Sequence, residues 1–533
     1  MTRWARFTVG AVAATAACAL SASTPAAHQG GTLRVNISKS DVTSLDPALD
    51  YEYLGWGVLW ATCAKLVNYP DEPAPLGSQL TPEVAGGLPR VSANGRTYTF
   101  TIRRGYRFNT GEPVTAQSFV RAFERDFSPK MASPAVSFIS DVVGAPAALK
   151  GKVKLPSGIK ASGDKLLITL VAPAPDLLAR LAMPFFCAVP VSTPIDPRGV
   201  TPAMAGPYYI ARRIPNRSIV LKQNPYYHGP RPHNVAEIDF TPDVDEPVSF
   251  LQIEKNQADY DIRGTPPVEI AGLAQKYGIN RGRFWVHPAI SVIFAALNAG
   301  RPPFNDVHVR QAANFALARE GIMSQGGYKA GTPTDQILPR SLRGFRDARI
   351  YPLTAPDIAR AKSLMGGRTA TATLYTTTDQ TATEQAQVIQ ANLARIGITV
   401  KIKQYAFGVL NNLTSLTSTP YDIVLTGWIA DYADPYDFIN VLLDGNKITK
   451  SNNPDMSQLN DPTFNRRMEQ AALILGPKRY ATYGQLDVDI SRDAAPWASL
   501  YNLNVREFLS NRVGCYTFQP VLGEMDLAAT CIK

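Results

Sequence analysis

The sequence predicts a mixed α/β chain built from two or three packed units, and three observations support this class. Its 533 residues are several times the length of a usual single domain. Hydrophobic residues make up 45% of the chain and charged residues 18%, which is enough to bury sizeable cores. Segments with period-two alternation and segments with helical periodicity follow one another, and no repeat of roughly 20 to 50 residues is visible, which favours a lobed architecture over a solenoid or propeller.

Residues 1–27 are expected to be a secretory signal peptide. Two arginines precede an apolar run from Phe7 to about Leu20, and small residues follow, which is the order typical of an export signal. The run is shorter than the roughly 20 apolar residues that span a bilayer. Cys18 leaves a second possibility open, since it follows two alanines as at the end of a lipoprotein cleavage box, although Thr15 stands where such boxes usually have a leucine-like residue. We therefore expect an exported chain, periplasmic or at the cell surface, with a lipid anchor on Cys18 as the alternative.

The first half of the mature chain is dominated by strand patterns. A helix is expected over 116–127, because Thr115 is a favourable cap and the apolar side chains form one stripe. The Pro-rich passage 172–207 is too irregular for a single element, and we expect it to cross a surface. Period-two alternation predicts strands at residues 31–38, 97–103, 166–171 and 219–222.

The second half starts near Phe284 and alternates helices with strands. Gly397 separates a predicted helix from the strand that follows it, which is a unit typical of an α/β layer. Gly427, Trp428 and an acidic cluster follow the last of these strands directly. The patterns predict strands at 294–297, 399–402 and 422–425, and helices at 307–317 and 383–396.

Cysteines other than Cys18 predict two disulfides. They are four in number, an even count in an oxidising compartment, and allow three pairings. We favour Cys515 with Cys531, because the short segment between them makes an easily closed loop, and this leaves Cys63 with Cys187. Buried free thiols are the alternative, and no two cysteines have the spacing of a zinc knuckle.

Charge and motifs argue against several functional classes. The net charge of +10 comes from 54 basic and 44 acidic residues that are scattered, which favours a solvated surface over nucleic-acid binding. The sequence has no nucleophile elbow, Walker loop, zincin pair or dinucleotide-binding glycine pattern. Asp431 with Asp434 could in principle do the acid/base work of a glycosidase, but nothing else in the chain supports it. We expect no catalytic residue, no metal and no cofactor.

Several short motifs occur in a fixed order along the chain: Ser44-Leu45-Asp46-Pro47, Leu80-Thr81-Pro82-Glu83-Val84-Ala85, Gly206-Pro207-Tyr208, Asn224-Pro225-Tyr226-Tyr227, Val309-Arg310-Gln311-Ala312 and Gly427-Trp428. In this order they resemble the bacterial extracellular solute-binding proteins of family 5, whose best-known members bind dipeptides and oligopeptides. Each motif alone is weak, but together they cover about residues 31–511.

The resemblance implies an α/β, two-lobed, periplasmic-binding-protein-like fold of the large three-part type II variety, with a ligand cleft between the lobes. One lobe would take residues 31–283, with an inserted subdomain at about 66–195, and the tail 496–533. The other lobe would take 284–495. The implied function is the substrate-binding component of an ABC importer, a monomer that delivers a small solute, most directly a di- or oligopeptide, to permease subunits in the membrane. A ligand-sensing receptor and a binder of a non-peptide solute are the alternatives.

The resemblance also implies a ligand site. In peptide-binding relatives the backbone at the positions of Gly427 and Ile429 pairs with the ligand like a strand, and the carboxylate at the position of Asp431 takes the ligand's α-ammonium. Backbone pairing does not depend on ligand side chains, whereas a carboxylate gives a charge-assisted bond to an amine. The alternative role for Asp431 is to cap a helix or turn.

Four further residues complete the expected site. Trp428 lies between the two pairing positions, with a place in the core as its alternative. Val42 and Thr43 belong to the stretch that lines the opposite side of the cleft in relatives. Tyr53 belongs to an aromatic cluster, with Tyr51 and Trp56, that could equally form the floor of a pocket or pack in the core.

Overall fold

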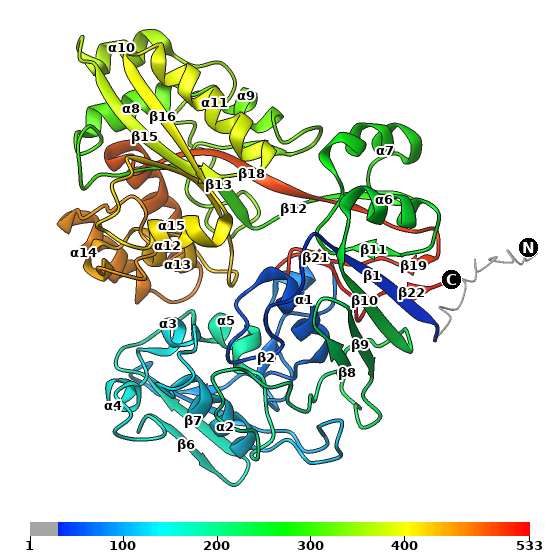
Figure 1. Ribbon diagram of the computed structural model, residues 1–533. Coiled ribbons are helices and arrows are strands. Elements are labelled where there is room, and N and C mark those ends of the chain that lie inside the picture. The colour runs from blue at the N-terminus through cyan, green and yellow to red at the C-terminus, as the bar shows by residue number, and fades with distance from the viewer. Residues whose placement is uncertain (1–29) are drawn as a thin grey trace, which may run out of the picture.

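The computed structural model describes residues 30–533, so the predicted signal peptide and Cys18 lie outside the described residues. The three larger sheets, of five, four and seven strands, organise the chain, and Figure 1 shows them in three separate parts of the molecule. The mixture of helices and sheets agrees with the predicted α/β class.

The first sheet has five strands in the order β11-β1-β10-β9-β8 and contains the start of the described chain. Strand β1 runs parallel to both of its neighbours, β10 and β11, and Leu33, Val35 and Ile37 on that strand are buried. The strands predicted at 31–38 and 219–222 are confirmed as β1 and β9. The elements of this part are β1 (Thr32–Ser38), α1 (Tyr53–Thr62), β8 (Tyr208–Ile214), β9 (Ser218–Gln223), β10 (Glu237–Val244), α6 (Glu246–Glu254), β11 (Tyr260–Asp261) and α7 (Ile270–Tyr277).

The second sheet has four strands in the order β4-β5-β7-β6, and short helices pack against it. The helix predicted after Thr115 is present, and the Thr115 N–H donates to Ser118 Oγ at 3.1 Å. The strands predicted at 97–103 and 166–171 are confirmed as β5 and β7. The elements are β4 (Arg90–Val91), β5 (Thr97–Thr101), α2 (Ala116–Asp126), α3 (Val136–Ile139), α4 (Ala145–Leu149), β6 (Ile159–Ser162), β7 (Lys165–Thr169) and α5 (Leu177–Leu181).

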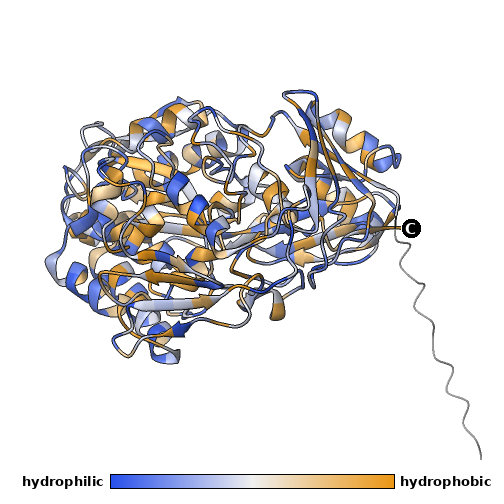
Figure 2. Ribbon diagram, turned by 90° about the horizontal axis from the view of Figure 1, so that it is seen from below, coloured by the Kyte–Doolittle hydropathy of each residue, from blue (hydrophilic) through white to orange (hydrophobic). Residues whose placement is uncertain are grey.

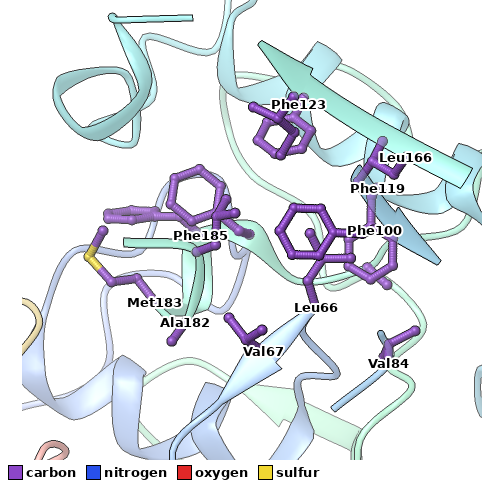
Figure 3. Close-up of a cluster of buried hydrophobic side chains, with 14 of the residues drawn as sticks. Leu66, Val67, Val84, Phe100, Phe119, Phe123, Leu166, Ala182, Met183 and Phe185 are labelled. Carbon is purple, nitrogen blue, oxygen red and sulfur yellow. The ribbon is translucent and has the colours of Figure 1, made fainter. Parts of the chain in front are cut away.

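The expectation that the Pro-rich passage 172–207 crosses a surface is wrong for residues 174–190, which are mostly buried, and right for residues 191–201, which are mostly exposed or half-buried. The passage contains α5, and Phe185 and Phe186 after it are only 1% exposed. Figure 3 shows Phe185 in the same core as Phe100 of β5 and Phe123 of α2. Proline breaks regular structure without preventing burial, so the composition predicted the irregularity of the whole passage but not the burial of its first part.

The third sheet has helices on both faces. Along β13, Val292, Phe294 and Ala296 face one hydrophobic cluster while Ala295 and Leu297 face another, as expected for a strand covered on both sides. Its strands are β12 (Phe284–Pro288), β13 (Ser291–Leu297), β14 (Gly331–Pro333), β15 (Ala370–Thr377), β16 (Ile398–Tyr405), β17 (Ile423–Ile429) and β18 (Trp497–Phe508). Its helices are α8 (Val307–Ala316), α9 (Arg319–Ser324), α10 (Ile358–Met365), α11 (Gln380–Ala394), α12 (Phe407–Thr414), α13 (Tyr436–Leu443), α14 (Pro462–Ala472) and α15 (Pro477–Asp489).

The helices and strands predicted in this half are confirmed, with one extension. The strand predicted at 422–425 continues to Ile429, so Gly427 and Trp428 lie within β17 and not after it. β17 pairs with β13 along its whole length but with β15 only at Ile423 and Val424.

Strands β12 and β18 join the third sheet to the rest of the molecule. The first half of β18 pairs with β13, and its second half, from Asn504 to Phe508, pairs with β12. In Figure 1 these two strands pass from the upper lobe toward the part that contains β1. The lobe boundaries expected at 283 and 496 stay predictions.

Both disulfide pairings are confirmed. Cys63 bonds with Cys187 at the C-terminal end of α1, and the bond lies in a small buried cluster with Leu59 and Met204. Cys515 bonds with Cys531, where β19 (Val513–Cys515) pairs with β22 (Cys531–Ile532).

Among residues 30–533, no helix combines the length and the apolar character needed to cross a membrane. Figure 2 shows hydrophilic and hydrophobic residues alternating along the helices, which is typical of helices that are packed on one side and solvated on the other.

Candidate ligand-binding site

A cavity of about 120 Å³ lies where the end of β17 faces α1 and α5. Its wall is rich in aromatic rings, which supply large apolar contact surfaces with polar edges. We call it the Asp431 cavity. It is lined by Tyr51, Glu52, Tyr53, Trp56, Trp60, Tyr69, Ala179, Ala182, Met183, Pro184, Ile429, Ala430, Asp431, Tyr432, Val521 and Leu522.

Asp431 is half-buried in this cavity and has a neutral partner. The Tyr51 hydroxyl donates to Asp431 Oδ2 at 2.7 Å, from the opposite side of the cleft. Burial raises the pKa of Asp431 to about 7, an effect that the hydrogen bond from Tyr51 only partly offsets. No lysine, arginine or histidine lines the cavity among the described residues, so the ionised form of Asp431 has no counter-charge there.

Asp437 holds the segment around Asp431 in place. One oxygen of Asp437, Oδ2, accepts the backbone N–H of Asp431 at 3.0 Å and the indole N–H of Trp428 at 3.1 Å. Asp437 is fully buried in the first turn of α13, and burial raises its pKa well above the ordinary value, with the neighbouring Asp431 adding to the effect. Asp437 was not among the predicted site residues, and its only signal in the sequence is a place in the acidic cluster six residues after Asp431.

The backbone of Gly427 and Ile429 lies on an unpaired edge. The N–H of Ala430 donates to the carbonyl of Ile290, and the N–H of Asn298 donates to the carbonyl of Asp422. In this antiparallel pair the backbone N–H and C=O groups of the even-numbered residues of β17 therefore face β13. The backbone groups of the odd-numbered residues face the opposite side, where no described strand pairs with β17 beyond Val424. The backbone groups of Gly427 and Ile429 are therefore free to bond an added strand.

The other predicted site residues are partly brought together. Tyr53, Tyr51 and Trp56 line the Asp431 cavity. Trp428 is half-buried and lines a larger neighbouring cavity of about 670 Å³, which also contains Tyr51 and Asp431. Thr43 is exposed and donates to Glu52, which lines the Asp431 cavity.

Val42 lies apart from this group. It is buried, and its carbonyl accepts a hydrogen bond from Arg213. Neither Val42 nor Thr43 lines the cavities described around Asp431.

A second tyrosine–aspartate hydrogen bond crosses the cleft beside the first. The Tyr432 hydroxyl donates to Asp176 Oδ2 at 3.0 Å, and Asp176 in turn pairs with Arg180. Tyr51 and Asp176 come from the N-terminal part of the chain, whereas Asp431 and Tyr432 follow β17. Neutral hydroxyl groups therefore bridge the two sides at two adjacent points.

Asp434 does not form an acid pair with Asp431. Its two oxygens accept from the Arg479 guanidinium at 2.7 and 3.1 Å, and it is buried against α15. Within residues 30–533, no group of three or more His, Cys, Asp or Glu side chains is placed to hold a metal ion.

Residues 79–450 match the family described as "Bacterial extracellular solute-binding proteins, family 5 Middle". The chain belongs to this family. The oligopeptide-binding protein OppA of Bacillus subtilis is 26% identical over 459 residues, which cover 80% of this chain and 81% of that protein.

Solved structures support the fold. The clavulanic acid biosynthesis oligopeptide binding protein 2 has a TM-score of 0.88 at 23% identity, covering 95% of this chain and 96% of that chain. The periplasmic binding protein DppA of Helicobacter pylori, in complex with peptide STSA, has a TM-score of 0.77 at 21% identity, covering 95% and 98%. The chain therefore has the two-lobed fold of these binding proteins.

Proposed function

We propose that this chain is the extracytoplasmic substrate-binding component of an ABC importer and that it captures di- or oligopeptides with a free α-amine. Lobe 1 would take residues 31–283 and the tail 496–533, and lobe 2 would take 284–495. Family membership supports the binding role, and the relatives named as oligopeptide-binding proteins support the ligand class.

The observation that carries the peptide assignment is the position of Asp431 at the end of an unpaired strand edge. A peptide backbone can add to the edge at Gly427 and Ile429. An α-ammonium in a partly dry cleft needs a compensating anion, because an unpaired buried charge costs more than the backbone hydrogen bonds return. Asp431 supplies that anion within reach of the same edge.

We place no catalytic step in this cleft. Asp431 has a hydroxyl partner and a neighbouring buried carboxyl group, but no activated nucleophile faces it among the lining residues. The ligand would instead stabilise the closed arrangement of the two lobes of a monomer, and the permease subunits in the membrane would recognise this closed form. Export to the periplasm or cell surface, with or without a lipid on Cys18, belongs to the same proposal.

Mass spectrometry of the natively purified protein tests the ligand class. We expect co-purifying molecules that fragment as peptides with a free N-terminus. Recovery of a sugar, a tetrapyrrole or a metal complex in stoichiometric amount, with no peptide, would contradict the proposal.

A further inference from the structure

A second cavity adjoins the Asp431 cavity on the side of the strands β12 and β18. Its volume is about 220 Å³, and the two cavities share Tyr53 and Ile429. We call it the arginine cavity. It is lined by Tyr53, Tyr260, Ile262, Arg263, Gly264, Thr265, Ala289, Ile429, Leu503, Asn504, Val505, Arg506 and Gly523.

The two cavities have opposite charge. The Asp431 cavity is lined by Glu52 and Asp431 and by no lysine or arginine among the described residues. The arginine cavity is lined by Arg263 and Arg506 and, in the described part of the chain, by no aspartate or glutamate. A ligand that extends over Ile429 from one cavity into the other therefore passes from an acidic to a basic environment.

Neither guanidinium has an acidic partner within residues 30–533. Arg263 is exposed, and its side chain makes no hydrogen bond or ion pair with a described residue. Arg506 is half-buried, and its Nη1 donates only to the carbonyls of Gly326 and Tyr328, at 2.8 and 3.2 Å. A guanidinium with unused N–H groups in a partly enclosed space is suited to bind a carboxylate through two parallel hydrogen bonds.

Three neighbouring carboxyl groups do not fill this role. Asp261 accepts the backbone N–H of Arg263 at 2.9 Å and the Ser249 hydroxyl, and it forms no ion pair with the described side chain of Arg263. Glu507 accepts the Tyr260 hydroxyl at 2.7 Å and lies behind the cavity wall with Glu524, and both glutamates are fully buried. Burial raises the pKa of both groups, so each binds a proton more readily than an exposed glutamate.

We propose that the arginine cavity binds a carboxylate group of the transported ligand, with Arg263 as the principal anchor and Arg506 beside it. This inference rests on the proposed function and narrows it, because the preferred ligand carries an anion close to its α-amine. The carboxylate has two possible sources, the C-terminus of a short peptide or an acidic side chain. Both present the same group to the guanidinium.

Calorimetric titration with three dipeptide probes tests the inference. Ala-Leu has only a C-terminal carboxylate, Ala-Leu amide has no carboxylate, and Ala-Glu amide has only a side-chain carboxylate. We expect the probe whose carboxylate reaches the arginine cavity to bind the Arg263→Gln variant at least tenfold more weakly than the unaltered protein. Ala-Leu amide should bind both proteins equally. If Arg263→Gln weakens the binding of Ala-Leu, the bound carboxylate is the C-terminus. If it weakens the binding of Ala-Glu amide, the bound carboxylate is the acidic side chain.

Two further variants control the experiment. Arg263→Lys keeps the positive charge and should recover part of the affinity, while Arg104→Gln removes an exposed arginine far from both cavities and should change nothing. Thermal unfolding of each variant checks that it is folded. Equal affinity of Arg263→Gln and the unaltered protein for both carboxylate probes overturns the inference and leaves the proposed function intact. If none of the three dipeptide probes binds the unaltered protein, the inference is overturned for dipeptides, whereas the wider assignment of di- or oligopeptides is tested by the molecules that co-purify with the protein.

Discussion

The burial of Asp431 determines how this residue can bind a ligand. Its carboxyl group lies in an aromatic cavity with one neutral hydrogen-bond donor, the Tyr51 hydroxyl. A carboxylate loses hydration in such a place, and its pKa rises to about 7 because no cation compensates. An ammonium group supplied by a ligand would provide that compensation, so the unliganded site is prepared for a cation.

The raised pKa of Asp431 predicts that peptide binding weakens in acid. Below about pH 7 the unliganded carboxyl group takes up a proton, and this proton must leave before the α-ammonium can pair with the carboxylate. From pH 7.5 to pH 5.5 the affinity for a free-amine peptide should fall roughly tenfold or more, while the peptide amine stays largely charged. Calorimetry across this range measures the effect, and Asp431→Asn should remove most of the pH dependence. A flat profile for the unaltered protein would contradict this account.

Asp437 is predicted to act as a positioning residue. Replacement by Ala leaves the backbone N–H of Asp431 and the indole N–H of Trp428 without their shared acceptor, so the free energy of unfolding should fall by about 2 to 4 kcal/mol. Asp437→Asn keeps one acceptor oxygen and should retain most of the stability. Urea unfolding of both variants checks the prediction. Equal loss in both would show that the charge of Asp437, and not its hydrogen bonds, matters.

Site residues that belong to a family motif could be predicted from the sequence. Site residues that are brought together only by the packing of distant elements could not. Asp431 follows a recognisable Gly427-Trp428 pair, so the motif locates it directly. Asp437 and Arg263 have no motif, because their roles depend on which elements pack beside them. Val42 was placed in the cleft by analogy, but its carbonyl is occupied by Arg213.

Among the elements, β17 was predicted at the correct place in the sequence but with its end four residues too early. Residues 422–425 are uniformly buried and predict a strand, whereas Gly427 and Ile429 are exposed and break that pattern. The backbone nevertheless continues in the ladder with β13, because pairing with a neighbour outweighs local composition. The exposed end of β17 is the part available to a ligand.

The two disulfides are predicted to stabilise the chain unequally. Cys63 and Cys187 are 124 residues apart and Cys515 and Cys531 are 16 apart, so the first constrains a much longer loop of the unfolded chain. By loop entropy we expect about 5 kcal/mol from the first bond and about 3 kcal/mol from the second. Guanidinium unfolding of the two paired Cys→Ser variants measures both values. A larger loss on removing Cys515 and Cys531 would contradict this order.

In the whole molecule, two strands, two hydrogen bonds and the packing of Tyr432 against Phe138 connect the two sides of the cleft. Strands β12 and β18 join the third sheet to the rest, while Tyr51–Asp431 and Tyr432–Asp176 bridge the cleft. Periodicity predicted seven of the strands and three of the helices in their correct order. The course of β18 could not be predicted, because one continuous strand pairs with β13 in one half and with β12 in the other, and the change from mostly apolar to mixed residues along it does not say which strand each half pairs with.

Removal of both bridging hydroxyls should open the unliganded protein. Tyr51→Phe combined with Tyr432→Phe keeps the rings but deletes both hydrogen bonds across the cleft. We expect a larger radius of gyration by small-angle X-ray scattering, and return to the compact value on adding a bound peptide. Tyr226→Phe, an exposed tyrosine outside the cleft cavities, is the matched control. No change in the double variant would show that other contacts hold the lobes together.

Pairing of Asp431 with the α-ammonium of a peptide is open to a double cycle of mutation and ligand modification. Asp431→Ala and the unaltered protein are each titrated in a calorimeter with one peptide and with its N-acetylated form. The mutation should weaken the free-amine peptide by about 2 to 5 kcal/mol, more than tenfold in affinity, because it removes the anion that compensates the ammonium. The acetylated peptide should bind the unaltered protein poorly and respond much less. An equal loss for both peptides would contradict the claim.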